Sequence, residues 1–480
     1  MDGGSTVDGS VGVSAMIRSS FVQCLSQETT QGLDIAQGFR RAERRPAAGR
    51  PAGRLSCPPA SATGSVLSVA PGSDGSERGP ARDDSVIVVG AGVIGLVTAL
   101  GLAQAGVPVR VLETTKTYPR GAHDMVYQWS VLDGLARLGV LEDCEAKALK
   151  VVRWAYRVLR TGERIEFDLA AVAPEVSHPF NLHLGRETMT ALLLEHLGRY
   201  PGAQIEWGTT VTHIAQDAEG VTVVVEAGDG GRTYRSTWVV GADGARSIVR
   251  RELGMAFAGM TWPDRFVATD LRFNFGELGF EAAGYQVDPR YGAVVANVDG
   301  SGRWRYIHAE NRTLPEETIG ERVQEILREV LPPGADPGIE RSIPYRIHER
   351  SAERFRAGRA LLVGDAAHLT NPTSSYGMKS GLFDAYALIE ALTAVVVDGV
   401  DEEILDRYSE ARHRNFWEFT LPTSCADKEF VFPFGSESRQ EEQLERLRRI
   451  AADPAALREH LLVVRGCETP SLRGEARSGR

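Results

Sequence analysis

The chain has 480 residues, of which 42% are hydrophobic and 25% charged, a composition typical of globular proteins with two or three domains. The net charge of −10 argues against a nucleic-acid groove, which needs a concentrated basic face. No apolar run reaches about 18 residues, so we expect no membrane span. The five scattered cysteines lack metal-ligand or CxxC spacing, which predicts no metal site and a reducing, cytoplasmic environment.

Residues 1–83 are predicted to form a disordered leader, because Gly, Ser, Ala, Pro and Arg dominate them and hydrophobic periodicity is weak. Two other interpretations stay open. The Arg and Ser content is also typical of transit peptides, although five acidic residues between Asp2 and Glu43 count against this. Alternatively, translation starts downstream of the segment.

The first ordered unit is predicted to begin at Ser85. Val86–Val89 is a short apolar run typical of a buried strand. A helix is expected from about Gly92 to Ala105, and a second strand from Val107 to Leu112. Together they form a βαβ unit.

Further elements follow from the hydrophobic periodicity along the rest of the chain. We expect helices near 130–138, 186–199 and 319–330, and another from about Gly377. Strands are expected within 204–240, with a hairpin turn at 228–231, and at 266–275, 292–298, 304–308 and 360–363. The segment after Glu402 is mostly helical and charged.

The motif Gly90-Ala91-Gly92-Val93-Ile94-Gly95 lies between the first strand and the first helix, the context that a dinucleotide fingerprint requires. Gly90 permits the tight turn, Gly92 lets the backbone approach a pyrophosphate, and Gly95 allows close helix–strand packing. Glu113 follows Gly90 by 23 residues (113 − 90), and its carboxylate can accept hydrogen bonds from a ribose diol. The acid disfavours NADP in this unit. A glycine turn in a nucleotide-free unit is the alternative.

Two more motifs occur later in the chain. Gly364-Asp365-Ala366-Ala367-His368 follows a strand, so Asp365 is placed to bind a sugar or ribityl hydroxyl, or else to cap a helix. The segment Pro372–Gly377 leads into a helix whose amides can face an anionic ring edge. Asp243-Gly244, followed by Ser247 and Arg250, is typical of a turn when considered alone.

In this order and spacing, the three motifs resemble those of the class A FAD-dependent aromatic monooxygenases, the family of 4-hydroxybenzoate hydroxylase and the phenol hydroxylases. The resemblance covers roughly residues 85–420. It implies an α/β fold in which a Rossmann-like FAD-binding domain (84–261 and 348–425) carries an inserted, mostly antiparallel β-sheet substrate domain (262–347) and a helical C-terminal tail (426–480).

The resemblance also implies the cofactor-binding residues, whereas it identifies no catalytic residue. Arg186 matches a family arginine that contacts the FAD pyrophosphate, with a solvated helix arginine as the alternative. The complete implied set is Gly90, Ala91, Gly92, Ile94, Gly95, Glu113, Arg186, Val211, Asp243, Gly244, Gly364, Asp365, Gly377, Met378 and Lys379.

The loop before the last predicted helix departs from the family pattern. Ser374, Ser375, Tyr376 and Lys379 stand where the family has other residues, while Gly377 is retained. Because family members contact the flavin here mainly through backbone amides, FAD binding is still expected. One hypothesis is that Lys379 brings a positive charge to the flavin N1–C2 edge; a solvent-facing lysine is the alternative.

The implied activity is that of a flavoprotein monooxygenase. NADH or NADPH reduces FAD, the reduced flavin reacts with O₂, and the C4a-hydroperoxyflavin hydroxylates a small aromatic or polycyclic substrate. Tyr306 and His308 are candidates to line the substrate pocket, whereas His368 is better explained as a structural histidine. A monomer or a homodimer is compatible with the sequence.

Three alternatives to this activity stay open. One is an FAD-binding protein without oxygenase activity, and another is a Baeyer–Villiger-type oxygenase. A flavin-dependent halogenase is the third, although Trp304-Arg305-Tyr306 does not supply the Trp-x-Trp-x-Ile-Pro signature of that group.

Overall fold

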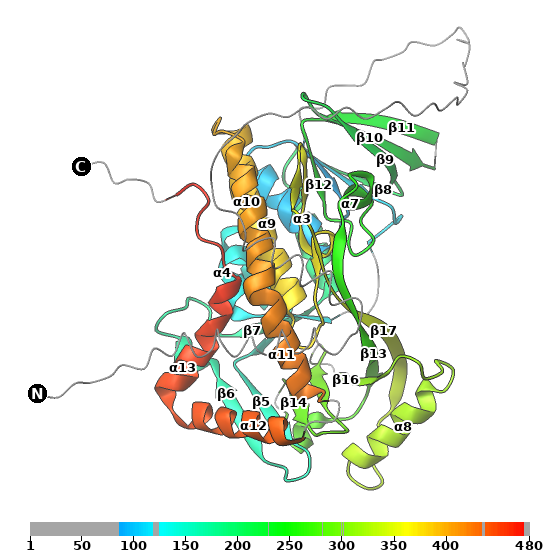
Figure 1. The fold of residues 1–480 in the computed structure, drawn as a ribbon, viewed down its shortest axis with the longest axis vertical. Coiled ribbons are helices and arrows are strands. Elements are labelled where there is room, and N and C mark those ends of the chain that lie inside the picture. Colours follow the sequence, from blue (N-terminus) through cyan, green and yellow to red (C-terminus); the bar gives the residue numbers. More distant parts are fainter. Residues whose placement is uncertain are drawn as a thin grey trace, which may run out of the picture.

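The structure is a computed structural model of the chain, drawn as a ribbon in Figure 1. It describes residues 86–118, 124–228, 230–280, 282–298, 300, 302–433 and 437–474. The predicted leader, 1–83, therefore lies outside the described residues. In the view of Figure 1, a parallel sheet with its helices forms the upper half, and a large sheet with α8 (Ile319–Val330), α12 (Glu437–Ala452) and α13 (Pro454–Leu462) forms the lower half.

The upper sheet has six strands in the order β18-β19-β12-β1-β2-β8. Its central strand β1 pairs in parallel with β2 on one side and with β12 on the other. All four residues of β1 are buried, as expected for a strand covered on both faces. The strands are β1 (Val86–Val89), β2 (Val109–Glu113), β8 (Ala203–Trp207), β12 (Trp238–Gly241), β18 (Arg356–Ala357) and β19 (Ala360–Leu362).

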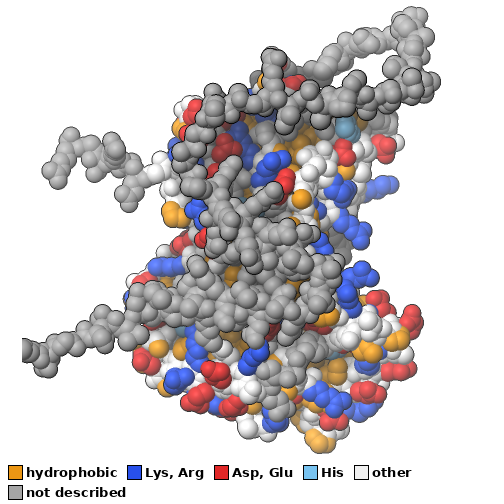
Figure 2. All heavy atoms as spheres, viewed as in Figure 1, with side chains coloured by type: hydrophobic (Ala, Val, Ile, Leu, Met, Phe, Trp, Pro, Cys, Tyr) orange, Lys and Arg blue, Asp and Glu red, His pale blue; other side chains and the backbone are white. Residues whose placement is uncertain are grey.

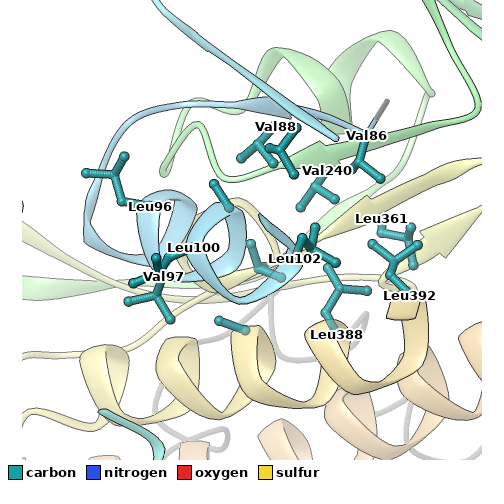
Figure 3. Close-up of a cluster of buried hydrophobic side chains, with 14 of the residues drawn as sticks. Val86, Val88, Leu96, Val97, Leu100, Leu102, Val240, Leu361, Leu388 and Leu392 are labelled. Atoms are coloured by element: carbon teal, nitrogen blue, oxygen red, sulfur yellow. The ribbon is translucent and has the colours of Figure 1, made fainter. Parts of the chain in front are cut away.

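Helices α3 (Val93–Gln104) and α9 (Tyr376–Val396) pack against each other beside this sheet. Figure 3 shows Leu96, Val97, Leu100 and Leu102 of α3 among side chains from the strands and from α9. Leu388 and Leu392 are the labelled contributors from α9. Helix α3 is apolar on nearly all sides, as expected for a buried helix. Its packing holds the helix N-terminus beside the end of β1.

The lower sheet has eight strands in the order β20-β17-β13-β16-β15-β14-β5-β6. Most neighbours are antiparallel, and β14 with β5 is a parallel pair. The strands are β5 (Arg153–Val158), β6 (Arg164–Asp168), β13 (Phe257–Leu271), β14 (Ala283–Val287), β15 (Ala293–Asn297), β16 (Trp304–Asn311), β17 (Ile339–Ala352) and β20 (His368–Leu369).

This sheet extends beyond the segment 262–347 that the sequence assigned to the substrate domain. Strands β5 and β6 precede that segment by about a hundred residues in the chain but pair at the far edge of the sheet. Their hydrophobic alternation indicates strands without indicating a partner, because pairing between distant segments leaves no local signal. The expected boundaries placed β5 and β6 in the FAD-binding domain, whereas in the structure both strands pair in the lower sheet.

The C-terminal helices cover the lower sheet. Leu444 and Leu447 of α12 and Leu461 of α13 share a buried cluster with Tyr156 and Phe167 from β5 and β6. Arg448 of α12 also forms an ion pair with Glu163. The other face of the sheet packs on α8, whose bounds match the helix expected at 319–330. The helices after residue 426 thus cover one face of the lower sheet.

Two three-stranded sheets and several short elements complete the described fold. One sheet is β9 (Thr210–Gln216), β10 (Val221–Ala227) and β11 (Gly230–Ser236), and the other is β3 (Asp124–Tyr127), β4 (Leu149–Val151) and β7 (Asn181–Gly185). The remaining helices are α4 (Trp129–Arg137), α5 (Leu141–Glu145), α6 (Arg186–Leu197), α7 (Ile248–Glu252), α10 (Glu403–Asn415) and α11 (Leu421–Val431). The 3₁₀ turns are η1 (Leu169–Val172), η2 (Phe275–Leu278), η3 (Gly364–Ala366) and η5 (Val463–Cys467), and η4 (Phe416–Thr420) is a π-helical turn between α10 and α11.

No helix in the described part of the chain combines the length and apolar character that crossing a bilayer requires. On the face drawn in Figure 2, acidic and basic side chains are interspersed over the lower half of the molecule.

Candidate active site

The glycine motif forms the turn between β1 and α3. Gly90 has φ +106°, and a Cβ there would lie 2.5 Å from the carbonyl oxygen of Ala242. A Cβ on Gly95 would lie 2.1 Å from the carbonyl oxygen of Gly90. By contrast, a Cβ on Gly92 would meet nothing within 4 Å, and this residue lines a large cavity. The turn therefore leaves its backbone open to a ligand at the N-terminus of a helix, where phosphates bind.

Glu113 ends β2 beside this turn. Its Oε2 accepts a hydrogen bond from the Ala91 amide over 2.8 Å, and its Oε1 accepts one from the Thr115 amide over 2.9 Å. The carboxylate is thereby held at the edge of the glycine turn. Oε1 also accepts a hydrogen bond from the Thr115 hydroxyl over 2.9 Å, so Oε2 is the oxygen with a further lone pair to which a ribose hydroxyl can donate.

The Asp-Gly motif organises the start of α7. Asp243 Oδ2 accepts hydrogen bonds from the amides of Ile248 and Val249 over 2.6 and 3.2 Å. Its Oδ1 is buried and has no hydrogen-bond partner among the described residues. Burial is the main influence on this carboxyl and raises its pKa. Gly244 has φ +74° and lines the large cavity, as expected for the residue that turns the chain.

Arg250 joins the Asp-Gly motif to the Gly-Asp motif. Its guanidinium donates to the carbonyl oxygen of Ala366 over 2.7 Å and to that of Ala245 over 2.8 Å. It also lies 3.7 Å from the centre of the Phe257 ring. Both motifs flank the same cavity because this buried cation holds their backbones together.

Gly364 and Asp365 follow β19. Gly364 has φ +58°, and its amide donates to Asp384 over 3.0 Å. Asp365 lines the large cavity, where burial raises the pKa of its carboxyl and the charges of His368 and Arg186 lower it. Arg186 begins α6 and lines the same cavity. Among the described residues its side chain has no hydrogen-bond partner, so its donors are available to an anion.

His368 lies away from the cavity. Its Nε2 is 2.7 Å from Asp384 Oδ2, and both side chains are fully buried. Its ring stacks on Phe416 with 5.0 Å between centroids. The structure thus gives His368 the structural role that the sequence favoured.

The loop before α9 contributes to two cavities. Gly377 and Met378 line the large one, whereas Lys379 lines a smaller one beside it. Ser375 lines both and has φ +57°, a left-handed conformation that costs a non-glycine residue some free energy. This loop therefore lies between the two cavities.

Three other sequence candidates face elsewhere. Val211 on β9 is 7% exposed and packs in the hydrophobic core, so only its backbone is available to a ligand. Tyr306 and His308 on β16 are buried on the face of the sheet opposite the cavity, while Arg305 and Ile307 face the cavity. The expectation that Tyr306 and His308 line the pocket was wrong, because alternation fixes which residues share a face but not which face is covered.

The large cavity has a volume of about 690 Å³. All three motifs contribute to its wall, through Gly92, Gly244 and Asp365, together with Arg186 and Met378. A wall that runs from a phosphate-binding turn to a second helix N-terminus fits an elongated dinucleotide. Gly92, which leaves open space where a Cβ would be, agrees with that fit.

A smaller cavity of about 210 Å³ lies next to the large one. The residues that line both cavities are Val126, His183, Val294, Ala296, Thr373 and Ser375. Trp154 and Tyr156 from β5 and Tyr285 from β14 form an aromatic wall, in which Tyr156 stacks on Tyr285 with 5.0 Å between centroids. This wall was not predicted from the sequence. The signal was present in the alternation of Trp154 and Tyr156, but β5 had been assigned to the other domain.

The comparisons with known proteins agree with this site. Residues 83–421 match the family model described as "FAD binding domain". The chain is 42% identical over 338 residues to 6-hydroxy-3-succinoylpyridine 3-monooxygenase of Pseudomonas putida (strain DSM 28022 / S16), covering 70% of this chain and 86% of the relative. It is 35% identical over 386 residues to para-nitrophenol 4-monooxygenase of Pseudomonas sp. (strain WBC-3), covering 79% and 94%.

A solved structure of similar fold is p-nitrophenol 4-monooxygenase from Pseudomonas putida DLL-E4. Its TM-score is 0.76 at 35% identity, with 80% of this chain and 98% of that chain covered. The fold and the cavity thus define an FAD-binding protein. More narrowly, the chain belongs to the FAD-dependent aromatic monooxygenases, and it is a flavoprotein monooxygenase that hydroxylates aromatic substrates. The family, fold class and activity expected from the sequence are confirmed.

Proposed function

We propose that the enzyme uses NADH or NADPH and O₂ to hydroxylate a single aromatic ring that carries a hydroxyl group. This proposal rests on one observation: the smaller cavity, which has the aromatic wall, shares part of its lining with the large cavity. A substrate in the one would therefore lie beside FAD in the other. Bound FAD would accept a hydride from the nicotinamide and activate O₂.

The large cavity is the proposed FAD site. Gly92 and the α3 N-terminus would take the pyrophosphate, with the charge of Arg186 facing it. Glu113 would accept hydrogen bonds from the ribose diol, and Asp365 from a ribityl hydroxyl. Gly377 and Met378, in the first turn of α9, have backbone amides without helical acceptors and would face the flavin.

The size of the smaller cavity supports a one-ring substrate. Pockets for drug-sized ligands span ~300–1,000 Å³. At about 210 Å³ this cavity is smaller, which disfavours the polycyclic substrates that the sequence left open. The two relatives reported above are named for a hydroxypyridine and a nitrophenol, and both names describe one hydroxyl-bearing ring. A hydroxylated benzene or pyridine ring is therefore the proposed substrate class.

The expected organisation into domains is proposed here in revised form. Strands β5 and β6 and the C-terminal helices are grouped with β13–β17 as the substrate half. A reducing, cytoplasmic environment is also proposed, in agreement with the buried thiols of Cys144 and Cys467.

The function is tested with purified protein loaded with FAD. We expect a flavin spectrum, and NAD(P)H oxidation that accelerates when 4-nitrophenol or a hydroxypyridine is added. Oxygen uptake should match product, and ¹⁸O₂ should label the product. NAD(P)H oxidation that yields only H₂O₂, with every such ring tried, would contradict the proposal. It would favour a flavoprotein with another role.

A further inference from the structure

A buried carboxyl group lies directly behind the wall of the large cavity. Two segments of that wall, 345–348 on β17 and 369–373 before α9, meet beside it. Glu349 follows the first segment and is 2% exposed. Its Oε1 accepts hydrogen bonds from the backbone amide and from Nδ2 of Asn371, over 3.1 and 2.7 Å. Since Asn371 lines the cavity, one residue separates this carboxyl group from the space proposed for FAD.

Asn371 connects Glu349 to the place where the two cavities meet. The Asn371 Oδ1 accepts a hydrogen bond from the Thr373 amide over 3.2 Å, and Thr373 lines both cavities. Asn371 Nδ2 also donates to the Ser424 hydroxyl on α11 over 2.6 Å. Glu349 thereby holds the start of the loop that leads to Gly377, which is proposed to face the flavin.

The second oxygen of Glu349 is left without a partner. Oε2 is buried, and no described residue forms a hydrogen bond with it. A buried carboxylate that is incompletely hydrogen-bonded is costly, whereas the uncharged acid costs less. Burial accordingly raises the pKa of Glu349 to about 7, although Asn371, Trp262 and Lys428 lower it. Glu349 can therefore gain or lose a proton near neutral pH.

The charged groups that face Glu349 come from β13 and α11. Lys428 on α11 forms an ion pair with Asp264 on β13 over 2.7 Å, and both side chains are buried. Trp262 on β13 donates from Nε1 to Glu349 Oε1 over 3.3 Å, and the Lys428 Nζ lies 3.9 Å from the centre of its ring. Because Asp264 balances Lys428, the three charged groups together are neutral when Glu349 is protonated and carry one negative charge when it is not.

We propose that Glu349 takes up a proton when the bound FAD is reduced, and that it is thus a redox-linked proton acceptor. This inference rests on the proposed location of FAD and concerns how its reduction depends on pH. Reduction by two electrons and one proton leaves the cofactor with one additional negative charge. A nearby negative charge disfavours the ionised form of a carboxyl group. Glu349 therefore binds one proton from solvent, which forms its O–H bond, and it exchanges no electron.

Proton uptake at Glu349 makes the reduction of FAD depend on pH. Well below pH 7 the carboxyl group is protonated before and after reduction, so it has no effect. Above about pH 7 it is ionised in the oxidised enzyme, and its negative charge opposes reduction. The reduction potential of FAD should therefore decrease more steeply with pH in this range, because about one additional proton is bound per FAD.

The first test measures the reduction potential of the FAD-loaded enzyme from pH 5.5 to 9 by anaerobic titration against redox dyes, without substrate or NAD(P)H. Glu349→Gln keeps an oxygen acceptor for Asn371 but cannot ionise. Between pH 7 and 8.5 the parent should bind about one proton more per FAD than this variant, and below pH 6 the same number. The potentials should coincide at low pH, and the parent should have the lower potential at high pH. Equal slopes at every pH would overturn the proposal.

Two further variants show whether the effect belongs to Glu349. Glu353→Gln removes an exposed carboxylate on the same segment of the chain and should follow the parent curve. Burial lowers the pKa of Lys379 to about 8, so this lysine titrates in the same range. Lys379→Met should nevertheless retain the additional proton. If the additional proton persists in Glu349→Gln and is lost in Lys379→Met, it belongs to the lysine, and the proposal is wrong.

The second test needs only the parent enzyme, so it applies even if Glu349→Gln does not retain FAD. An infrared difference spectrum between the reduced and oxidised enzyme at pH 8 should show a new C=O band of a protonated carboxyl group, which shifts in ²H₂O. At pH 5.5 this band should be absent from the difference. No such band at pH 8 would contradict proton uptake by Glu349.

These outcomes are distinct from those of the proposed function, because neither test uses an aromatic substrate or O₂. An enzyme that hydroxylates no one-ring phenol but shows the additional proton would contradict the proposed function and retain the role of Glu349. Coupled hydroxylation with equal slopes in parent and Glu349→Gln would have the opposite meaning. FAD content and melting temperature show whether each variant is folded.

Discussion

Arg412 donates a hydrogen bond from Nε to Asp384 Oδ1 over 2.7 Å, and both side chains are completely buried. The other carboxylate oxygen accepts from the Gly364 amide and contacts His368. The guanidinium also donates to the Cys467 carbonyl oxygen over 2.7 Å. This ion pair therefore joins the Gly-Asp motif to α9, α10 and the C-terminal segment.

Arg412→Met should destabilise the protein strongly, because it leaves the Asp384 carboxylate buried without its cation. Breaking a buried pair from one side costs ~3–5 kcal/mol. Urea unfolding should show this loss, together with weaker FAD retention because the Gly364 turn is no longer anchored. Arg199→Met removes an exposed i,i+4 pair and should change stability by at most ~0.5 kcal/mol. Similar losses in both variants would contradict the role of the buried pair.

Glu349 provides a prediction about pH. Burial raises the pKa of this carboxyl from 4.5 to about 7, although Asn371 and Trp262 donate hydrogen bonds to it. The folded state thus keeps a proton that the unfolded state has lost. The contribution of Glu349 to the free energy of unfolding is largest below pH 4.5. It decreases as the pH rises to about 7 and does not change further above that pH.

Glu349→Gln should remove this dependence of the free energy of unfolding. A raised pKa of this size corresponds to roughly 3 kcal/mol between the two ends of the range. The stability of the variant, measured by urea unfolding from pH 5 to 8, should therefore fall less steeply than that of the parent. Exposed Glu329→Gln on α8 is the control and should follow the parent curve. Parallel curves for parent and Glu349→Gln would exclude the assignment.

Two alanine substitutions in the glycine turn should have different effects, one on folding and the other on FAD binding. Gly95→Ala places a methyl group against the Gly90 carbonyl oxygen and should unfold the βαβ unit or prevent its expression in soluble form. Gly92→Ala meets no protein atom within 4 Å, so it should fold with a nearly unchanged melting temperature. Its methyl group points into the large cavity, the proposed FAD site, and should lower the bound FAD fraction. Full FAD content in folded Gly92→Ala would contradict the proposed cofactor site.

Local features of this fold were predictable from the sequence, whereas relations between distant segments were not. The bounds of Val86–Val89 and Ile319–Val330 follow from short-range periodicity, and the structure reproduces them. Lys379 was expected near the start of a helix, and it is, but it faces the smaller cavity instead of the large one. Which face of α9 meets which cavity depends on packing against segments more than 200 residues away, such as Gln128 (379 − 128 = 251).

The aromatic wall illustrates the same limit. Trp154 and Tyr156 lie on one face of β5, as alternation requires, but their site exists only because β5 pairs with β14. Asp243 shows the opposite case. The sequence assigned it to FAD binding, and in the structure its carboxylate also caps α7, a local role that a turn motif predicts.

Substitution of Asp365 tests the ribityl end of the proposed FAD site. Its carboxylate lines the large cavity, and loss of a hydrogen bond to a charged group costs ~1.5–3 kcal/mol. Asp365→Ala should therefore bind FAD about 10- to 100-fold more weakly. Fluorescence titration of the apoprotein with FAD measures this change. Glu410→Gln, at an exposed site on α10, should bind FAD like the parent, and an equally unaffected Asp365→Ala would remove the residue from the site.

Trp154 sets the size of the smaller cavity. Its indole stacks on Phe167 with 4.6 Å between centroids and meets Tyr285 edge-on at 5.7 Å. Trp154→Leu should enlarge the cavity and remove aromatic contacts worth ~0.5–1.5 kcal/mol. The KM for a one-ring phenol should then rise by up to about tenfold, while coupled oxidation of 1-naphthol, which the parent should reject, becomes measurable. Trp207→Leu on β8 lies outside the cavity and should change neither value. If the parent already hydroxylates 1-naphthol as efficiently as a one-ring phenol, the cavity bounded by Trp154 does not limit the substrate to one ring.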